Sequence, residues 1–206
     1  MKLSTHAGRA LALALVTSAC AKSEPGAEPP GDRAKLQEAD MVKVVSVVKG
    51  DEVRVQAEGK SARLRLVGIY AMDDVAAADP TATESLAASL LQSEIVGKVV
   101  TLHLATPPED AHGRYLGSLD VGGRDLGLSL LEGGRVIAYT EFPFDRESLY
   151  LRAESAARAG KRGIWRKDTL VATARGLRKQ WSEARSQGGA AAADDELLAP
   201  APAAPQ

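Results

Sequence analysis

The chain has 206 residues, with 26 Lys and Arg against 27 Asp and Glu, so its formal net charge at pH 7 is −1. This length suffices for one domain with a sizeable core and terminal tails. Nucleic-acid-binding domains often carry a basic excess, and this chain has none, so any phosphate site must be a local cluster of arginines. No apolar run reaches the roughly 18 residues of a membrane-spanning helix.

The first twenty residues have the pattern of a targeting segment. Lys2 and Arg9 give a positive start, residues 11–16 (LALALV) form a short apolar run, and small residues lead to Cys20. Cys20 is the only cysteine, so no disulfide can form within the chain. A lone cysteine at this place resembles a bacterial lipoprotein signal, in which the thiol is lipidated and becomes the mature N-terminus.

We therefore expect residues 1–20 to be a signal peptide of the lipoprotein type. The protein would then be exported to the cell envelope and held there by a lipid anchor rather than by a spanning helix. The alternative is ordinary secretion of a soluble, periplasmic or extracellular protein, with cleavage after Ala21.

Composition divides the rest of the chain. Residues 21–40 are rich in Pro, Gly, Glu and Ala and predict a flexible tether, and residues 186–206 are of low complexity and predict a disordered tail. The folded domain is expected over 41–165, with an additional amphipathic helix over 166–185. That helix carries an apolar stripe among basic residues, so it either packs on the domain or offers a basic flank to nucleic acid or anionic lipid. The stripe consists of Leu170, Ala174, Leu177 and Trp181.

Alternating apolar and polar residues predict five strands, at about 42–48, 51–57, 62–69, 98–105 and 114–121. A helix near 82–96 follows a capping box of Thr81 and Glu84, and Asp125 can cap a short helix. This order predicts an α+β fold, a five-stranded OB-type β-barrel with three helices plus the added C-terminal helix. We expect its core to include Leu64, Leu66, Leu102 and Leu104.

The stretch from 49 to 74 carries the candidate chemistry. One hairpin holds Asp51 near its start and Arg65 in its second strand, with Asp73 and Asp74 just past its end. Carboxylates hold hard cations through oxygen, and Arg grips phosphate with two donors at once. The pattern indicates a phosphate and metal site, although the exposed face of an antiparallel hairpin also carries such residues when it is merely solvated.

Four features in order resemble the staphylococcal nuclease (thermonuclease) family. GDEV at 50–53 resembles the family's DGDT[VI] turn, and RLVGI at 65–69 resembles its R-L-x-G-I-D-x-P-E signature. DAHGRYL at 110–116 resembles D-x-Y-G-R-x-L, and RAESAARAGKRGIW from Arg152 resembles the final helix with its closing G-[IL]-W. The resemblance covers about residues 41–165 and implies a calcium-dependent phosphodiesterase that cleaves DNA and RNA.

Site residues carry over by position. The resemblance makes Asp51 a metal ligand, and it makes Arg65 and Arg114 the phosphate-binding arginines. One arginine clamps the attacked phosphate and the other stabilises charge in the transition state. Asp73 falls where the family has its general-base glutamate, and Ala71 keeps the backbone carbonyl that the family's threonine lends to the metal. Such a site suits phosphoryl transfer, which depends on positioning and charge neutralisation.

The sequence departs from the family at the metal. Tyr70 replaces a metal-binding aspartate, and a neutral phenol is a poor calcium ligand. Lys49 replaces the first aspartate of the turn, and Asp73 is one methylene short. Asp74 is a possible substitute carboxylate if the loop is re-routed, and His112, where the family has Tyr, is a candidate for stacking on a base.

Two functions therefore stay open for a chain expected to be a monomer. The first is a nuclease with weakly bound calcium and slow cleavage of DNA or RNA. The second is a catalytically degenerate OB module that binds nucleic acid or an envelope partner and performs no chemistry. Asp51, Arg65 and Arg114 favour the first, whereas Tyr70 and Lys49 favour the second.

Overall fold

The computed structural model describes residues 33–73 and 87–198, and their side chains as far as residue 188. Cys20, Asp74 and the expected capping box of Thr81 and Glu84 lie outside the described residues.

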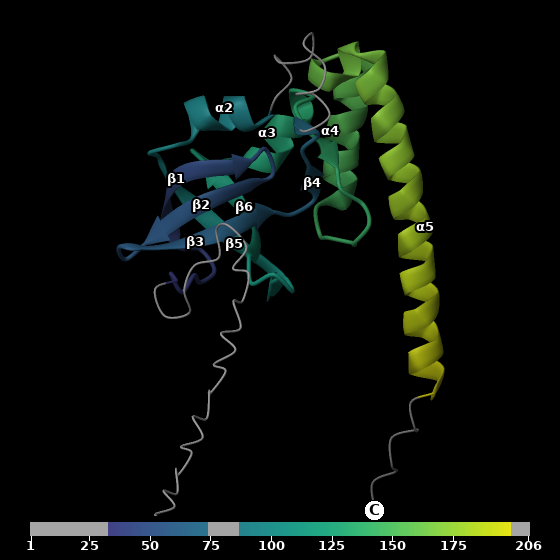
Figure 1. Ribbon diagram of the computed structural model, residues 1–206, viewed down its shortest axis with the longest axis horizontal. Helices are drawn as coiled ribbons and strands as arrows, with labels where there is room; N and C mark the ends of the chain where they lie inside the picture. The colour runs from purple at the N-terminus through teal and green to yellow at the C-terminus, as the bar shows by residue number, and fades with distance from the viewer. Residues whose placement is uncertain (1–32, 74–86, 199–206) are drawn as a thin grey trace, which may run out of the picture.

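Five strands form a closed β-barrel, as the sequence predicts (Figure 1). Their order is β3-β2-β1-β5-β6, neighbours are antiparallel, and a parallel pairing of β3 with β6 closes the circle. The strands are β1 (Met41–Lys49), β2 (Glu52–Ala57), β3 (Lys60–Leu66), β5 (Val99–Glu109) and β6 (Tyr115–Val121). The short β7 (Arg124–Asp125) extends the sheet beyond β6, and β4 (Ile69–Tyr70) pairs separately with β8 (Ile137–Ala138).

The core follows the period of two that strands impose on their side chains. Leu64, Leu66 and Leu102 are buried, as expected. Leu104 is only partly buried, because the β5–β6 register breaks after it and its side chain lies at the wall of a surface pocket. The expectation of a fully buried Leu104 is therefore wrong.

Strand β3 ends three residues earlier than the alternation predicts. Gly68 has φ 73°, and a Cβ on it would lie 2.4 Å from the Phe144 ring, so the chain turns out of the barrel here. The turn starts β4 as a separate element and directs the next residues, through Asp73, toward the β1–β2 turn.

Helices cover the barrel and extend past it. They are α2 (Ala87–Glu94), α3 (Leu126–Glu132), α4 (Glu147–Ala159), the 3-10 turn η2 (Gly163–Arg166) and α5 (Asp168–Leu198). As predicted, Asp125 caps α3 by accepting the Leu128 N–H at 2.8 Å. No helix among the described residues is both long enough and apolar enough to cross a membrane.

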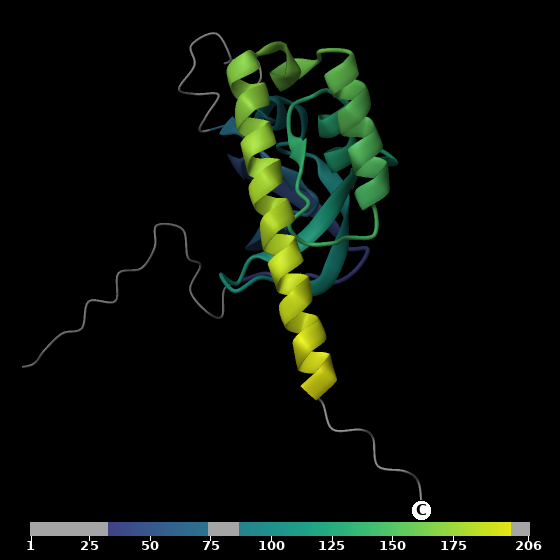
Figure 2. The ribbon, with the colours of Figure 1, turned by 90° about the vertical axis from the view of Figure 1, so that its right-hand side faces the viewer.

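Helix α5 is longer than the sequence predicts and continues past residue 185. Figure 2 shows it along the side of the domain, with its end projecting beyond the barrel. Leu170, Ala174 and Trp181 pack in a second apolar cluster. Arg178 lies 2.7 Å from Glu154 of α4, and Arg185 lies 2.8 Å from Glu147 at the start of α4. These two arginines therefore dock the helix rather than form a free basic flank.

Folded structure begins before Met41, within the stretch expected to be a tether. Ala34 donates to the Ser61 carbonyl at 2.8 Å, and Ala34 and Leu36 are buried. The Tyr115 hydroxyl accepts the Leu36 N–H and donates to the Ala34 carbonyl, each at 3.2 Å. Composition could not indicate this, because the partner is a tyrosine on a distant strand.

Replacing Tyr115→Phe tests this attachment. The ring stays, but the buried Leu36 N–H loses its acceptor, which costs about 1–3 kcal/mol. Urea unfolding should show that loss. Ser186→Ala is the control, because it removes an exposed hydroxyl bond within α5 and should change the free energy of unfolding by less than about 0.5 kcal/mol. Equal effects would mean that the Tyr115 hydroxyl does not stabilise this attachment.

Candidate functional site

A small pocket of about 80 Å³ lies beside the β1–β2 turn, where β3 and β6 pair. It brings together the five described residues to which the sequence assigned a metal, phosphate or catalytic role, namely Asp51, Arg65, Ala71, Asp73 and Arg114. Its lining consists of Lys49, Asp51, Glu52, Arg65, Tyr70, Ala71, Asp73 and Arg114. His112 is exposed on the β5–β6 turn and does not line the pocket.

Asp51 lines this pocket with 4% of its surface exposed. Its Oδ2 lies 3.6 Å from Arg65 Nη2 and accepts the Ala71 N–H at 3.4 Å. Burial raises the pKa of the Asp51 carboxyl above its ordinary value, while the Arg65 charge acts in the opposite direction. The turn thus presents a buried carboxylate that borders one guanidinium.

The two arginines meet because of the parallel strand pairing. Arg65 is in register with Leu116, and Arg114 precedes the first residue of β6, so both side chains reach the pocket. Arg65 also lies over the Tyr139 ring, with 5.7 Å between Cζ and the ring centroid. The Arg65 side chain is 25% exposed and that of Arg114 is 17% exposed, so both keep contact with solvent.

Arg114 is already paired with two carboxylates. Its Nε donates to Asp110 Oδ2 at 2.7 Å, and its Nη2 lies 2.7 Å from the same oxygen. Its Nη1 donates to Glu52 Oε2 at 2.9 Å. These hydrogen bonds hold the guanidinium firmly at the pocket.

Sequence reasoning assigned no role to Glu52. Its side chain is 3% exposed and also lies 2.6 Å from Arg63, so it bridges two arginines at the pocket wall. The sequence did offer one signal, because Glu52 stands where the family's DGDT[VI] turn has threonine.

Asp73 joins three backbone segments. Its Oδ2 accepts the Gly50 N–H at 2.7 Å, and its Oδ1 accepts the Ala87 N–H at 2.9 Å, at the start of the described part of α2. A Cβ on Gly50 would lie 2.6 Å from Asp73 Oδ2, so the close approach requires glycine there. Asp73 thus has the geometry of a helix cap, and its role as a general base stays a prediction.

Tyr70 packs in an aromatic cluster that also anchors α5. The ring centroid of Trp181 lies 5.4 Å from that of Tyr70 and 4.8 Å from that of Tyr139, both in edge-to-face contact. Tyr139 therefore contacts both Trp181 of α5 and the Arg65 guanidinium. No local pattern in the sequence indicates this contact, because its members come from distant parts of the chain.

The barrel, the site and the motif order agree with one comparison. Residues 63–167, just over half of the chain, match the family model described as Staphylococcal nuclease homologue. The chain belongs to this family. No curated protein matches it in a search of whole sequences.

Members of the staphylococcal nuclease homologue family typically use calcium, and the described residues fit that ion only in part. Calcium takes about six to eight oxygen ligands. Asp51 offers a carboxylate and Ala71 a carbonyl at the pocket, whereas both oxygens of Asp73 accept backbone N–H groups. In the described part of the chain, no group of three His, Cys, Asp or Glu side chains is arranged to hold a metal.

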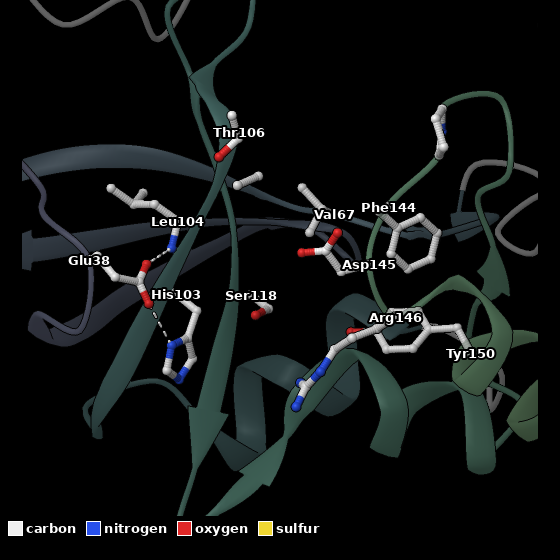
Figure 3. A pocket seen from close by; sticks show the side chains of 12 residues that line it. Glu38, Val67, His103, Leu104, Thr106, Ser118, Phe144, Asp145, Arg146 and Tyr150 are labelled. Atoms are coloured by element: carbon white, nitrogen blue, oxygen red, sulfur yellow. Dashed lines mark hydrogen bonds and ion pairs between the residues drawn. The ribbon is translucent and has the colours of Figure 1, made fainter.

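A second, larger pocket of about 440 Å³ contains none of the predicted site residues (Figure 3). On one side of it, Glu38 lies 2.9 Å from His103 Nδ1 and accepts the Leu104 N–H. Arg146 pairs with Asp125. Because its lining includes one arginine, against two at Asp51, this pocket is a weaker candidate for phosphate.

The capping geometry predicts that Asp73→Ala destabilises the fold by about 1–2 kcal/mol, because it removes a helix cap together with the bond to Gly50. Asp73→Asn should cost less, since one oxygen can still cap α2. Urea unfolding of the two variants measures this order. Unchanged stability in both, combined with lost cleavage, would instead favour the general-base role.

Proposed function

We propose that the protein is a phosphodiesterase that hydrolyses DNA and RNA as a monomer, slowly and with weakly bound calcium. Membership of the family supports a nuclease-type activity. The observation that carries the proposal is the pocket in which Asp51, Arg65 and Arg114 converge. Two guanidiniums beside a buried carboxylate suit a phosphodiester, because Arg matches phosphate geometry.

In this proposal the arginines receive the substrate phosphate. Arg65 and Arg114 bind its oxygens from two sides of the pocket and stabilise the charge that builds up during displacement. Tyr139 and Asp51 hold Arg65 in place, and Asp110 holds Arg114 along its Nε and Nη2 edge, so both guanidiniums are positioned before the substrate binds. Calcium, when bound, would offset negative charge on the phosphate.

The second candidate is an OB module that binds nucleic acid or an envelope partner without catalysis. Two observations favour it. Tyr70 is committed to the aromatic cluster instead of offering a carboxylate, and Arg114 is offset by two carboxylates. The nuclease remains the main proposal because Asp51 and both arginines share one pocket.

We also propose that the mature protein is a cell-envelope lipoprotein attached through Cys20. The support is the sequence pattern alone: a positive start, a short apolar run and a single cysteine directly after it.

Purified protein should cleave single-stranded DNA and RNA slowly at millimolar calcium and stop when a chelator is added. Arg65→Gln and Arg114→Gln should each lower the cleavage rate by about a hundredfold or more, because each removes a donor to the transition state. Gel analysis of end-labelled oligonucleotides measures this, with surface variant Lys179→Gln as the control. Binding without cleavage at any calcium concentration would support the non-catalytic module.

Lipidation predicts that Cys20→Ala moves the protein from the membrane fraction to the soluble fraction. Loss of the thiol removes the acceptor for the lipid, and a lipid chain supplies the hydrophobic attachment. Immunoblots of fractionated cells measure the shift, and mass spectrometry identifies the mature N-terminus. A mature protein that begins at Lys22 would show ordinary secretion instead.

A further inference from the structure

We propose that Glu52 restrains Arg114 by competing with the substrate phosphate for its guanidinium, so that Glu52 sets the anion affinity of the site. The inference rests on the proposed function in one respect, because it takes Arg114 as a phosphate-binding residue. Glu52 stands where the family's DGDT[VI] turn motif has a threonine.

The hydrogen bonds of Arg114 leave a phosphate little access. A guanidinium has five N–H groups, and paired donors along its edges give the bidentate grip on phosphate. Asp110 occupies the edge made by Nε and Nη2, and Glu52 takes one donor of Nη1. Because Glu52 already accepts from Nη1, an incoming phosphate must share that group with Glu52 or displace it.

Charge acts in the same direction as geometry. Arg63, Glu52, Arg114 and Asp110 form a chain of ion pairs with two positive and two negative groups. A phosphate that approaches Arg114 therefore meets a group with no net charge. The Glu52 carboxylate is 3% exposed, so water screens its attraction to Arg114 poorly, and an anion must displace a strong ion pair.

The position of Glu52 also points to a role at the site. Glu52 is paired in register with Arg65 across the β2–β3 hairpin, yet its carboxylate is bonded to Arg63 and Arg114 instead. It lines the same pocket as Asp51 and Arg65. A carboxylate in this place occupies one of the positions at which a substrate phosphate would contact Arg114.

The test is a binding measurement on the full chain with a fluorescein-labelled single-stranded oligodeoxynucleotide, in chelator so that nothing is cleaved. Glu52→Gln keeps the shape of the side chain and removes its charge, and it should tighten binding by roughly tenfold, the effect of one moderate charge interaction. Inorganic phosphate should compete at correspondingly lower concentration. Glu132→Gln is the matched control, because Glu132 is a surface carboxylate paired with Arg124 and its loss changes the net charge equally.

A double-mutant cycle shows whether the gain passes through Arg114. Arg114→Gln should weaken binding little in the wild-type background, where the guanidinium is restrained, and by roughly tenfold in the Glu52→Gln background. Additive effects would overturn the proposal, as would unchanged or weaker binding by Glu52→Gln or an equal gain in Glu132→Gln.

Thermal melting checks that the variants fold. If Glu52→Gln does not fold, Glu52→Thr takes its place with the same expectation, and failure of both to fold would overturn the proposal in favour of a structural role. Tighter binding by Glu52→Gln with no cleavage by any variant would reject the proposed nuclease and keep the restraint. Cleavage by the wild type with unchanged affinity in Glu52→Gln would do the reverse.

Discussion

The parallel pairing of β3 with β6 is the constraint on which the site depends. It closes the barrel and places Arg65 opposite Leu116, the second residue of β6. Arg114 directly precedes β6, so it lies close to Arg65. Every other neighbouring pair in the barrel is antiparallel, so this one contact joins the hairpin that carries Asp51 to the loop that carries Asp110. A slip of one residue would turn Arg65 to the other face of its strand.

Much of this arrangement could be predicted from the sequence, for reasons that differ between its parts. Strand period and motif order predicted the barrel and the meeting of Asp51, Arg65 and Arg114, because both are set by local pattern and chain order. The link from Asp73 to α2 depends on the path of a loop, and the bonds of Glu52 depend on which of several nearby arginines it meets. Neither has a periodic signal. The early start of the fold was likewise hidden, because Pro and Gly in residues 21–40 mask the burial of Leu36 under Tyr115.

The carboxylates and arginines of the pocket are already paired with one another. Asp51 borders Arg65, Glu52 bridges Arg63 and Arg114, and both oxygens of Asp73 accept backbone N–H groups. Such saturation makes the site rigid, and rigidity assists a reaction that relies on fixed positions. It also leaves few groups unengaged for an incoming ligand, so affinity is limited by internal competition as much as by the number of ligating groups.

Tyr70 stands where the family resemblance places a metal-ligating aspartate, and it packs against Trp181 of α5. The same position therefore bears on both ion binding at the barrel and docking of the terminal helix. An aspartate there would add a metal ligand and at the same time remove an aromatic partner of α5, so a gain at the metal would come with a loss of helix packing. In this chain Tyr70 packs against the helix instead of offering a carboxylate. Trp181 of α5 also contacts Tyr139, over whose ring Arg65 lies, so the C-terminal helix supports the surroundings of Arg65.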